Sequence, residues 1–186
     1  MKQYDKILLL LILMEIFPAP QAVWKKPFIV VIDRVVCSKY LNTLLYFECY
    51  LKKLTKGKSA VGTSLMLRND LNVNAEIQGA IFFSIKGGKW VKFVDYKTNI
   101  CNFLQNLLSL PLANLVRNEI LKKSNFPCTC PVKGNIVYNI TDFIISNVFL
   151  PPYMPREMNF NGSLTYFENK NIIGVAWLEG RTMPRN

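Results

Sequence analysis

Residues 124–134 read SNFPCTCPVKG, and this short stretch holds two of the five cysteines, two of the ten prolines and a closing glycine. Prolines stiffen the backbone and cysteine pairs crosslink it, so these residue types together indicate a rigid joint. The patterns before the stretch indicate β-strands and one helical run, and those after it indicate further strands. The stretch, called the cysteine–proline loop below, is therefore expected to join two halves of one fold.

Alternating apolar and polar residues predict short β-strands on both sides of the cysteine–proline loop. The expected strands are residues 28–37, 46–54, 59–67, 75–85, 90–96, 136–141, 160–166 and 173–177. Residues 86–89, Lys-Gly-Gly-Lys, are typical of a two-residue hairpin turn. Short strands separated by turn signals predict an all-β fold, an immunoglobulin-like antiparallel β-sandwich.

Residues 99–123 interrupt this pattern with one helical excursion. Their apolar residues recur at steps of three and four, which is typical of an amphipathic helix. They are Leu104, Leu107, Leu108, Leu112, Leu115, Val116 and Ile120. Pro111 falls within the run and is expected to begin a second helical segment. The apolar stripe either packs on the sheets or lines and covers a cavity.

The composition argues against the common catalytic and metal centres. The chain has 186 residues, 51% of them apolar, which suits one domain with a single core. It has no histidine, which removes the usual general base and the usual metal ligand. The acidic residues fall in separate predicted elements, with no motif that pairs two carboxylates. We therefore expect no enzymatic activity, no metal and no cofactor.

The N-terminus has the pattern of a secretory signal peptide. Lys2 and Lys6 accompany the apolar run of residues 7–14, and residues 18–22 (PAPQA) supply small residues for cleavage. The run is far shorter than the roughly 20 residues that span a bilayer. We expect residues 1–22 to be removed, which leaves residues 23–186 as a single extracellular domain.

Secretion makes disulfide bonds the expected state of the cysteines. They are Cys37, Cys49, Cys101, Cys128 and Cys130. Because five is odd, one thiol is left over. A metal site is disfavoured, since the loop cysteines are spaced C-x-C and no histidine is present to complete a site. Two N-glycosylation sequons, at Asn139 and Asn161, agree with secretion.

The order of these features over residues 28–177 resembles an insect family of secreted domains of unknown function. The shared features are Cys37, Cys49, the strand that ends in Asp95 and Cys101, the leucine-rich run, the Ser-Asn-Phe-Pro…Cys-Pro…Gly pattern of the loop, and the Pro151…Pro155 step. That family includes the Che proteins of chemosensory tissue and is related to the ganglioside activator proteins and the ML lipid-recognition domains. The ordered set carries the resemblance, and no single motif does.

The resemblance implies a β-sandwich whose sheets part around an apolar cavity, with no catalytic residues. It implies a secreted, disulfide-bonded binding protein for a lipid or other apolar ligand, with a role in pheromone or taste detection. It also implies the disulfides Cys37–Cys49 and Cys101–Cys130. Because the family pattern has one cysteine in the loop, Cys128 is expected to be unpaired or to be the alternative partner of Cys101.

Strand alternation and the helical stripe select the residues expected on the cavity walls. They are Ile81, Phe83, Val91, Phe93, Leu107, Leu108, Tyr138 and Trp177. The competing interpretation of each is an ordinary core position. Burying a twelve-carbon chain between such walls would contribute roughly 10 kcal/mol before association costs, which is enough for micromolar binding.

The formal net charge of +11 supports a second class of function. Lys52, Lys53, Lys56 and Lys58 lie close together in the sequence and would attract anionic membrane or polysaccharide surfaces. The competing interpretation of these lysines is an ordinary solvated face. Nucleic acid is disfavoured as a partner by secretion. A co-receptor for a membrane receptor or channel is a further alternative, which the sequence does not separate from a free carrier.

Overall fold

The computed structural model describes residues 28–54, 58–85, 87–150 and 154–185. The predicted signal peptide, Lys56 and residues 151–153 of the proline-rich step lie outside these ranges. No helix in the described ranges is both long enough and apolar enough to cross a membrane.

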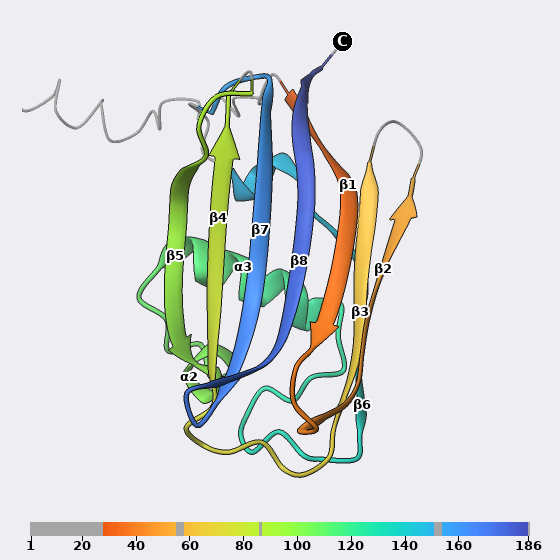
Figure 1. Cartoon of the computed structure of the whole chain (residues 1–186), viewed down its shortest axis with the longest axis vertical. Helices are drawn as coiled ribbons and strands as arrows, with labels where there is room; N and C mark the ends of the chain where they lie inside the picture. Colours follow the sequence, from red (N-terminus) through yellow and green to blue (C-terminus); the bar gives the residue numbers. More distant parts are fainter. Residues whose placement is uncertain (1–27, 55–57, 86, 151–153, 186) are drawn as a thin grey trace, which may run out of the picture.

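The larger sheet has five antiparallel strands in the order β1-β8-β7-β4-β5. These strands are β1 (Phe28–Lys39), β4 (Glu76–Ser84), β5 (Val91–Asn99), β7 (Met158–Glu168) and β8 (Asn171–Pro184). The tight turn between β7 and β8 places Asn169 and Lys170 at positive φ, which is typical of a two-residue hairpin loop. Figure 1 shows the five strands side by side, with β1 next to the second sheet.

The smaller sheet has three antiparallel strands in the order β2-β3-β6. They are β2 (Leu44–Lys53), β3 (Ser59–Leu67) and β6 (Val137–Ile144). The two sheets form an antiparallel β-sandwich, which confirms the predicted all-β fold. Each predicted strand is present, with ends that differ from the prediction by no more than three residues, except that β8 continues seven residues beyond the predicted end at Trp177.

The helical excursion consists of α2 (Ile100–Leu104) and α3 (Pro111–Lys122), and a short 3-10 helix, η2 (Asn147–Phe149), follows β6. Pro111 is the first residue of α3, where its missing N–H and fixed φ suit a helix start. In Figure 1, α3 crosses behind β4, β7 and β8. The helix thus covers a part of the large sheet that the three-stranded sheet leaves open.

Two disulfides hold these layers together, and both predicted pairings are confirmed. Cys37–Cys49 joins β1 to β2, so it links the two sheets. Cys101–Cys130 joins α2 to the cysteine–proline loop. Cys128 is exposed and has a free thiol, as expected.

The cysteine–proline loop is a structural joint. The amide of Leu71 donates to the carbonyl of Val132 at 2.8 Å, and the amide of Gly134 donates to the Asp70 carboxylate at 2.9 Å. The Lys133 ammonium lies 2.8 Å from the same carboxylate. Hydrogen bonds from Lys133 and Gly134 lower the pKa of Asp70. The loop is therefore fixed to the connection between β3 and β4.

Candidate functional site

The core contains an apolar cavity of about 240 Å³, called the large cavity below. Its walls come from the inner face of the five-stranded sheet, from β3 and β6, and from α2 and α3. The residues from α2, from α3 and from the position just before α3 are Phe103, Leu110, Leu112, Ala113, Val116 and Ile120. The helical stripe therefore lines a cavity over much of its length, which was one of its two interpretations.

Small residues create much of this space. Gly79 on β4, Gly162 on β7, Ala113 on α3 and Ala176 on β8 all line the large cavity. A Cβ atom built on Gly79 would lie 3.6 Å from a Leu164 methyl carbon, which is an ordinary contact. Neither Gly79 nor Gly162 has the positive φ that requires glycine. Backbone geometry therefore does not explain these glycines, and their effect is to leave the wall hollow.

A second cavity of about 70 Å³, the small cavity, adjoins the first. It is lined by β2, β3, α2 and the cysteine–proline loop, which contributes Phe126 and Val132. The residues that border both cavities are Ile77, Phe103, Ile120, Ile140 and Leu164. The two spaces are thus neighbouring parts of one hollow core.

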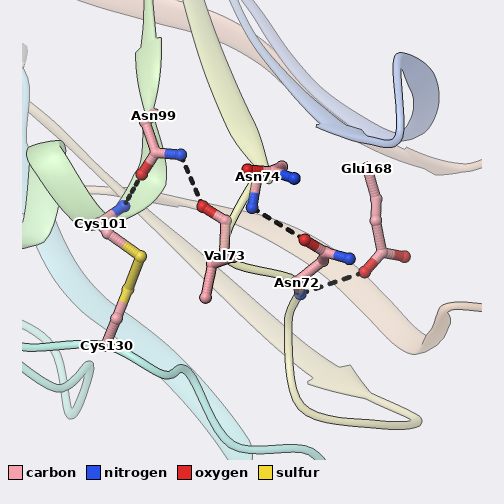
Figure 2. Close-up of a disulfide and its surroundings, with 7 residues drawn as sticks. All are labelled: Asn72, Val73, Asn74, Asn99, Cys101, Cys130 and Glu168. Atoms are coloured by element: carbon pink, nitrogen blue, oxygen red, sulfur yellow. Dashed lines mark hydrogen bonds between the residues drawn. A yellow bond between two sulfur atoms is a disulfide. The ribbon is translucent and has the colours of Figure 1, made fainter.

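A network of hydrogen bonds holds the wall of the small cavity in place beside the Cys101–Cys130 disulfide (Figure 2). The Asn99 side chain accepts from the amide of Cys101 and donates to the carbonyl of Val73, both at 2.7 Å. It therefore caps the start of α2 and attaches it to the β3–β4 connection. Glu168, at the end of β7, accepts from the amide of Asn72 at 3.2 Å, which ties the same connection to the large sheet.

Arg117 fixes α3 against the end of α2. Its guanidinium donates to the carbonyl of Phe103 at 2.7 Å and also to the carbonyl of Leu104. These carbonyls belong to the last turn of α2, where a cation is favoured by the helix dipole. Asn114 adds a hydrogen bond of 3.1 Å to the carbonyl of Leu108 in the connection between the helices. One side chain therefore holds together the two helices of the cavity wall.

No charged residue lines either cavity within the described part of the chain. The small cavity has one lining residue with a polar side chain, Tyr166, and burial raises the pKa of its phenol to about 12. In the large cavity, the lining residues with hydroxyl groups are Thr63, Tyr96, Thr98 and Ser163. The Tyr96 hydroxyl lies 3.5 Å from the Ser109 hydroxyl at the exposed β5 edge, and this hydrogen bond lowers its pKa. The interior thus suits an uncharged, mainly apolar ligand.

Four of the predicted wall residues lie on the inner side of the molecule. Ile81 lines the large cavity. Phe83 and Phe93 pack edge to face, with ring centroids 6.2 Å apart, in the adjoining core cluster rather than in a cavity wall. Tyr138 is buried and stacks on Phe126, with centroids 4.9 Å apart, so Phe126 separates it from the small cavity.

Of the other four predictions, three need correction, and Trp177 holds only in part. Val91 is 50% exposed and Leu107 is 63% exposed, so neither lies in a wall, and the half-buried Leu108 lies outside both cavity linings. Trp177 borders the large cavity, but strand pairing places it opposite Ser163, on the face away from the inner residues Ala176 and Leu178. The Arg34 guanidinium lies 5.9 Å from the centroid of its ring.

Two β-bulges interrupt the regular alternation of β5 and β8. The register of β4 and β5 shifts between Ile81 and Phe82, so Val94 and Tyr96 face the cavity, which regular alternation from Val91 and Phe93 did not predict. Val91 pairs with Phe83 and is exposed because it begins the edge strand β5. The register of β7 and β8 shifts between Tyr166 and Phe167, which turns Trp177 outward. An extra residue in one strand exchanges the inner and outer positions beyond it, so regular alternation gives the wrong face.

The small residues of the wall were missed because apolar patterns do not select glycine. The signal that was present is a glycine at mid-strand on two predicted strands, Gly79 and Gly162, which is unusual where no turn is needed.

The sequon residues Asn139 and Asn161 lie on outer faces of the two sheets. The Asn139 side chain accepts from the Ser64 hydroxyl at 2.6 Å. Among the described residues, no group of three or more metal-ligating side chains comes together.

Comparison with known proteins shows that part of the chain is similar to a family of unknown function. Residues 77–161 match the model of the family described as "Protein of unknown function (DUF1091)". That range contains β4, β5, both helices, the cysteine–proline loop and β6. No curated protein sequence matches this chain. A crystal structure of a protein from Archaeoglobus fulgidus aligns with 77% of this chain and 98% of its own, with 11% identity and a TM-score of 0.23.

Proposed function

We propose that this protein is a secreted binding protein that holds a lipid or other apolar ligand in the large cavity. The observation that carries the proposal is a cavity of about 240 Å³ with an almost wholly apolar wall that contains no charged residue in the described chain. An apolar cavity of about 150 Å³ inside a protein already stays dry and binds benzene. A larger apolar space between two sheets and a helix suits a bound hydrocarbon chain.

Energetics support a role for this space. An empty cavity costs about 24 cal/mol per Å³, so 240 Å³ corresponds to about 6 kcal/mol relative to a filled core. The disulfides close loops of 12 and 29 residues and are expected to contribute about 3 kcal/mol each. The stabilisation from the two disulfides therefore offsets the free-energy cost of leaving this space in the core unfilled. A ligand recovers the lost contacts when it binds.

The extracellular location is part of this proposal. Two disulfides are typical of an oxidising compartment, and they agree with the signal pattern in residues 1–22 and with the two sequons. The resemblance to the Che proteins and to lipid-recognition domains supports a role in pheromone or taste detection. The same resemblance is compatible with a membrane receptor or channel as the partner of the ligand-bound protein.

A second candidate function rests on the end of the β2–β3 hairpin. Lys52, Lys53 and Lys58 gather there, and of these three lysines only Lys52 has an acidic partner among the described residues, Asp142 at 3.7 Å. Such a group would draw the protein to anionic membrane surfaces. Binding of this kind would weaken steeply with added salt, whereas binding inside an apolar cavity would not.

Displacement of a fluorescent probe tests the proposal. N-phenyl-1-naphthylamine is added to delipidated protein, and long-chain compounds are titrated at two salt concentrations. Saturable probe binding and its displacement at micromolar concentration, independent of salt, would support the cavity. Absence of probe binding together with salt-dependent binding to anionic vesicles would favour the second candidate instead.

A further inference from the structure

Tyr166 is an exception in the wall of the small cavity. Of the described residues that line this cavity, it alone has a polar side chain, and its ring packs edge to face against Phe47, with centroids 5.8 Å apart. Its neighbours on the inner face of the sheet are Gly174, which lies opposite it on β8, and Leu164, two residues before it on β7. The phenol therefore lies in surroundings that are otherwise apolar.

No hydrogen bond joins the Tyr166 hydroxyl to another described residue, and this half-buried side chain is not one of the fully enclosed unpaired polar groups, which are Asn114 Oδ1 and Ser124 Oγ. A hydroxyl in an apolar wall gains little unless it finds an acceptor, so an oxygen of a ligand beside the Tyr166 hydroxyl would be favoured. Burial raises the pKa of this phenol to about 12, so it remains a neutral donor at physiological pH. By contrast, the buried Tyr138 is paired with the backbone of Lys133 at 3.1 Å.

The absence of charge restricts the class of ligand. A carboxylate or phosphate buried in either cavity would need a cation or several donors, and no described lining residue is charged. A pure hydrocarbon would leave the Tyr166 hydroxyl unpaired. A neutral molecule with one hydrogen-bond acceptor satisfies both conditions.

We propose that the ligand is a neutral long-chain compound with one oxygen acceptor, such as a ketone, an aldehyde or an ester. The acceptor lies in the small cavity and receives the Tyr166 hydroxyl hydrogen, while the chain occupies the large cavity. This inference rests on the proposed function, because it assigns a polarity to the same ligand. The residues that border both cavities, among them Ile77 and Leu164, would surround the chain where it passes from one space to the other.

Probe displacement by three compounds of equal chain length tests the assignment. An n-alkane, a methyl ketone and a carboxylic acid are compared on the natural protein, on Tyr166→Phe and on Tyr46→Phe. Tyr46 is exposed on β2 and lines neither cavity, so Tyr46→Phe is the matched control. Thermal melting of each variant checks that it is folded.

We expect the ketone to bind the natural protein about tenfold more tightly than the alkane, and Tyr166→Phe to remove that difference without changing alkane affinity. Tyr46→Phe should behave like the natural protein. Equal loss of ketone and alkane binding in Tyr166→Phe, no loss at all, or tightest binding of the acid would overturn the assignment while leaving the proposed function in place. Failure of all three compounds to bind the natural protein would overturn both.

Discussion

Cys101, at the start of α2, is bonded to Cys130 in the cysteine–proline loop, so one covalent bond closes the wall of the small cavity. The double substitution Cys101→Ser and Cys130→Ser should lower the free energy of unfolding by about 3 kcal/mol, because it frees a 29-residue loop in the unfolded chain. Urea denaturation measures the loss. Cys128→Ser is the control, since that thiol is exposed and unpaired, and its midpoint should not change.

Gly134 lies against the backbone of Asn69, and this contact leaves no space for a side chain. A Cβ atom built on Gly134 would overlap the Asn69 carbonyl carbon. Gly134→Ala should therefore destabilise the fold by about 1–3 kcal/mol through a backbone shift. Gly79→Ala is the matched control, because its Cβ would meet Leu164 at 3.6 Å. Thermal melting should show a lower midpoint for Gly134→Ala alone, and equal midpoints would contradict the account of the loop.

Arg117 is expected to control how firmly α3 covers the large cavity. Arg117→Met keeps much of the side-chain length but removes the hydrogen bonds to the carbonyls of Phe103 and Leu104. Loss of these charged bonds should cost about 1–3 kcal/mol and should loosen α2 and α3. Hydrogen exchange should then speed up in both helices and not in the strands. Arg34→Met, on the outer face, is the control, and faster exchange in that variant would argue against a specific role for Arg117.

The Tyr166 phenol makes stability depend on pH in the alkaline range. Its pKa is about 12 in the folded protein and near the ordinary value of 10.0 when unfolded. Below pH 10 the phenol is protonated in both states and contributes no pH dependence. As pH rises from 10 to about 12, the unfolded chain loses the proton first, so stability should fall by about 2–3 kcal/mol.

Tyr166→Phe separates this effect from other alkaline changes. Urea denaturation of the variant and of the natural protein between pH 9 and pH 11.5 should show curves that diverge above pH 10. Parallel curves over the whole range would mean that the phenol is not buried as the structure shows.

Much of the fold was predictable because its signals are local. Alternation of apolar residues marked every strand, and Pro111 marked the start of α3. The pairings Cys37–Cys49 and Cys101–Cys130 followed from a family resemblance, and the structure confirms them.

The cavity wall was harder to predict because it depends on contacts between distant strands. Regular alternation placed Trp177 inside, whereas a bulge in the β7–β8 pairing turns it outward. Gly79 and Gly162 carry no apolar signal, yet their missing side chains help to form the space. The position of α3 over the sheet depends on Arg117, whose partners lie 13 and 14 residues away.

Gly79→Leu tests directly whether the large cavity is the binding site. The new side chain would point into the space beside Leu164, and it should fill the cavity without harm to folding. Thermal melting should give a midpoint at or above that of the natural protein.

Native mass spectrometry of the two secreted proteins, before and after exposure to a long-chain methyl ketone, is the deciding measurement. We predict a mass increase that corresponds to one bound apolar molecule for the natural protein and none for Gly79→Leu. No bound molecule on the natural protein, or equal occupancy of both proteins, would contradict a ligand site in the large cavity.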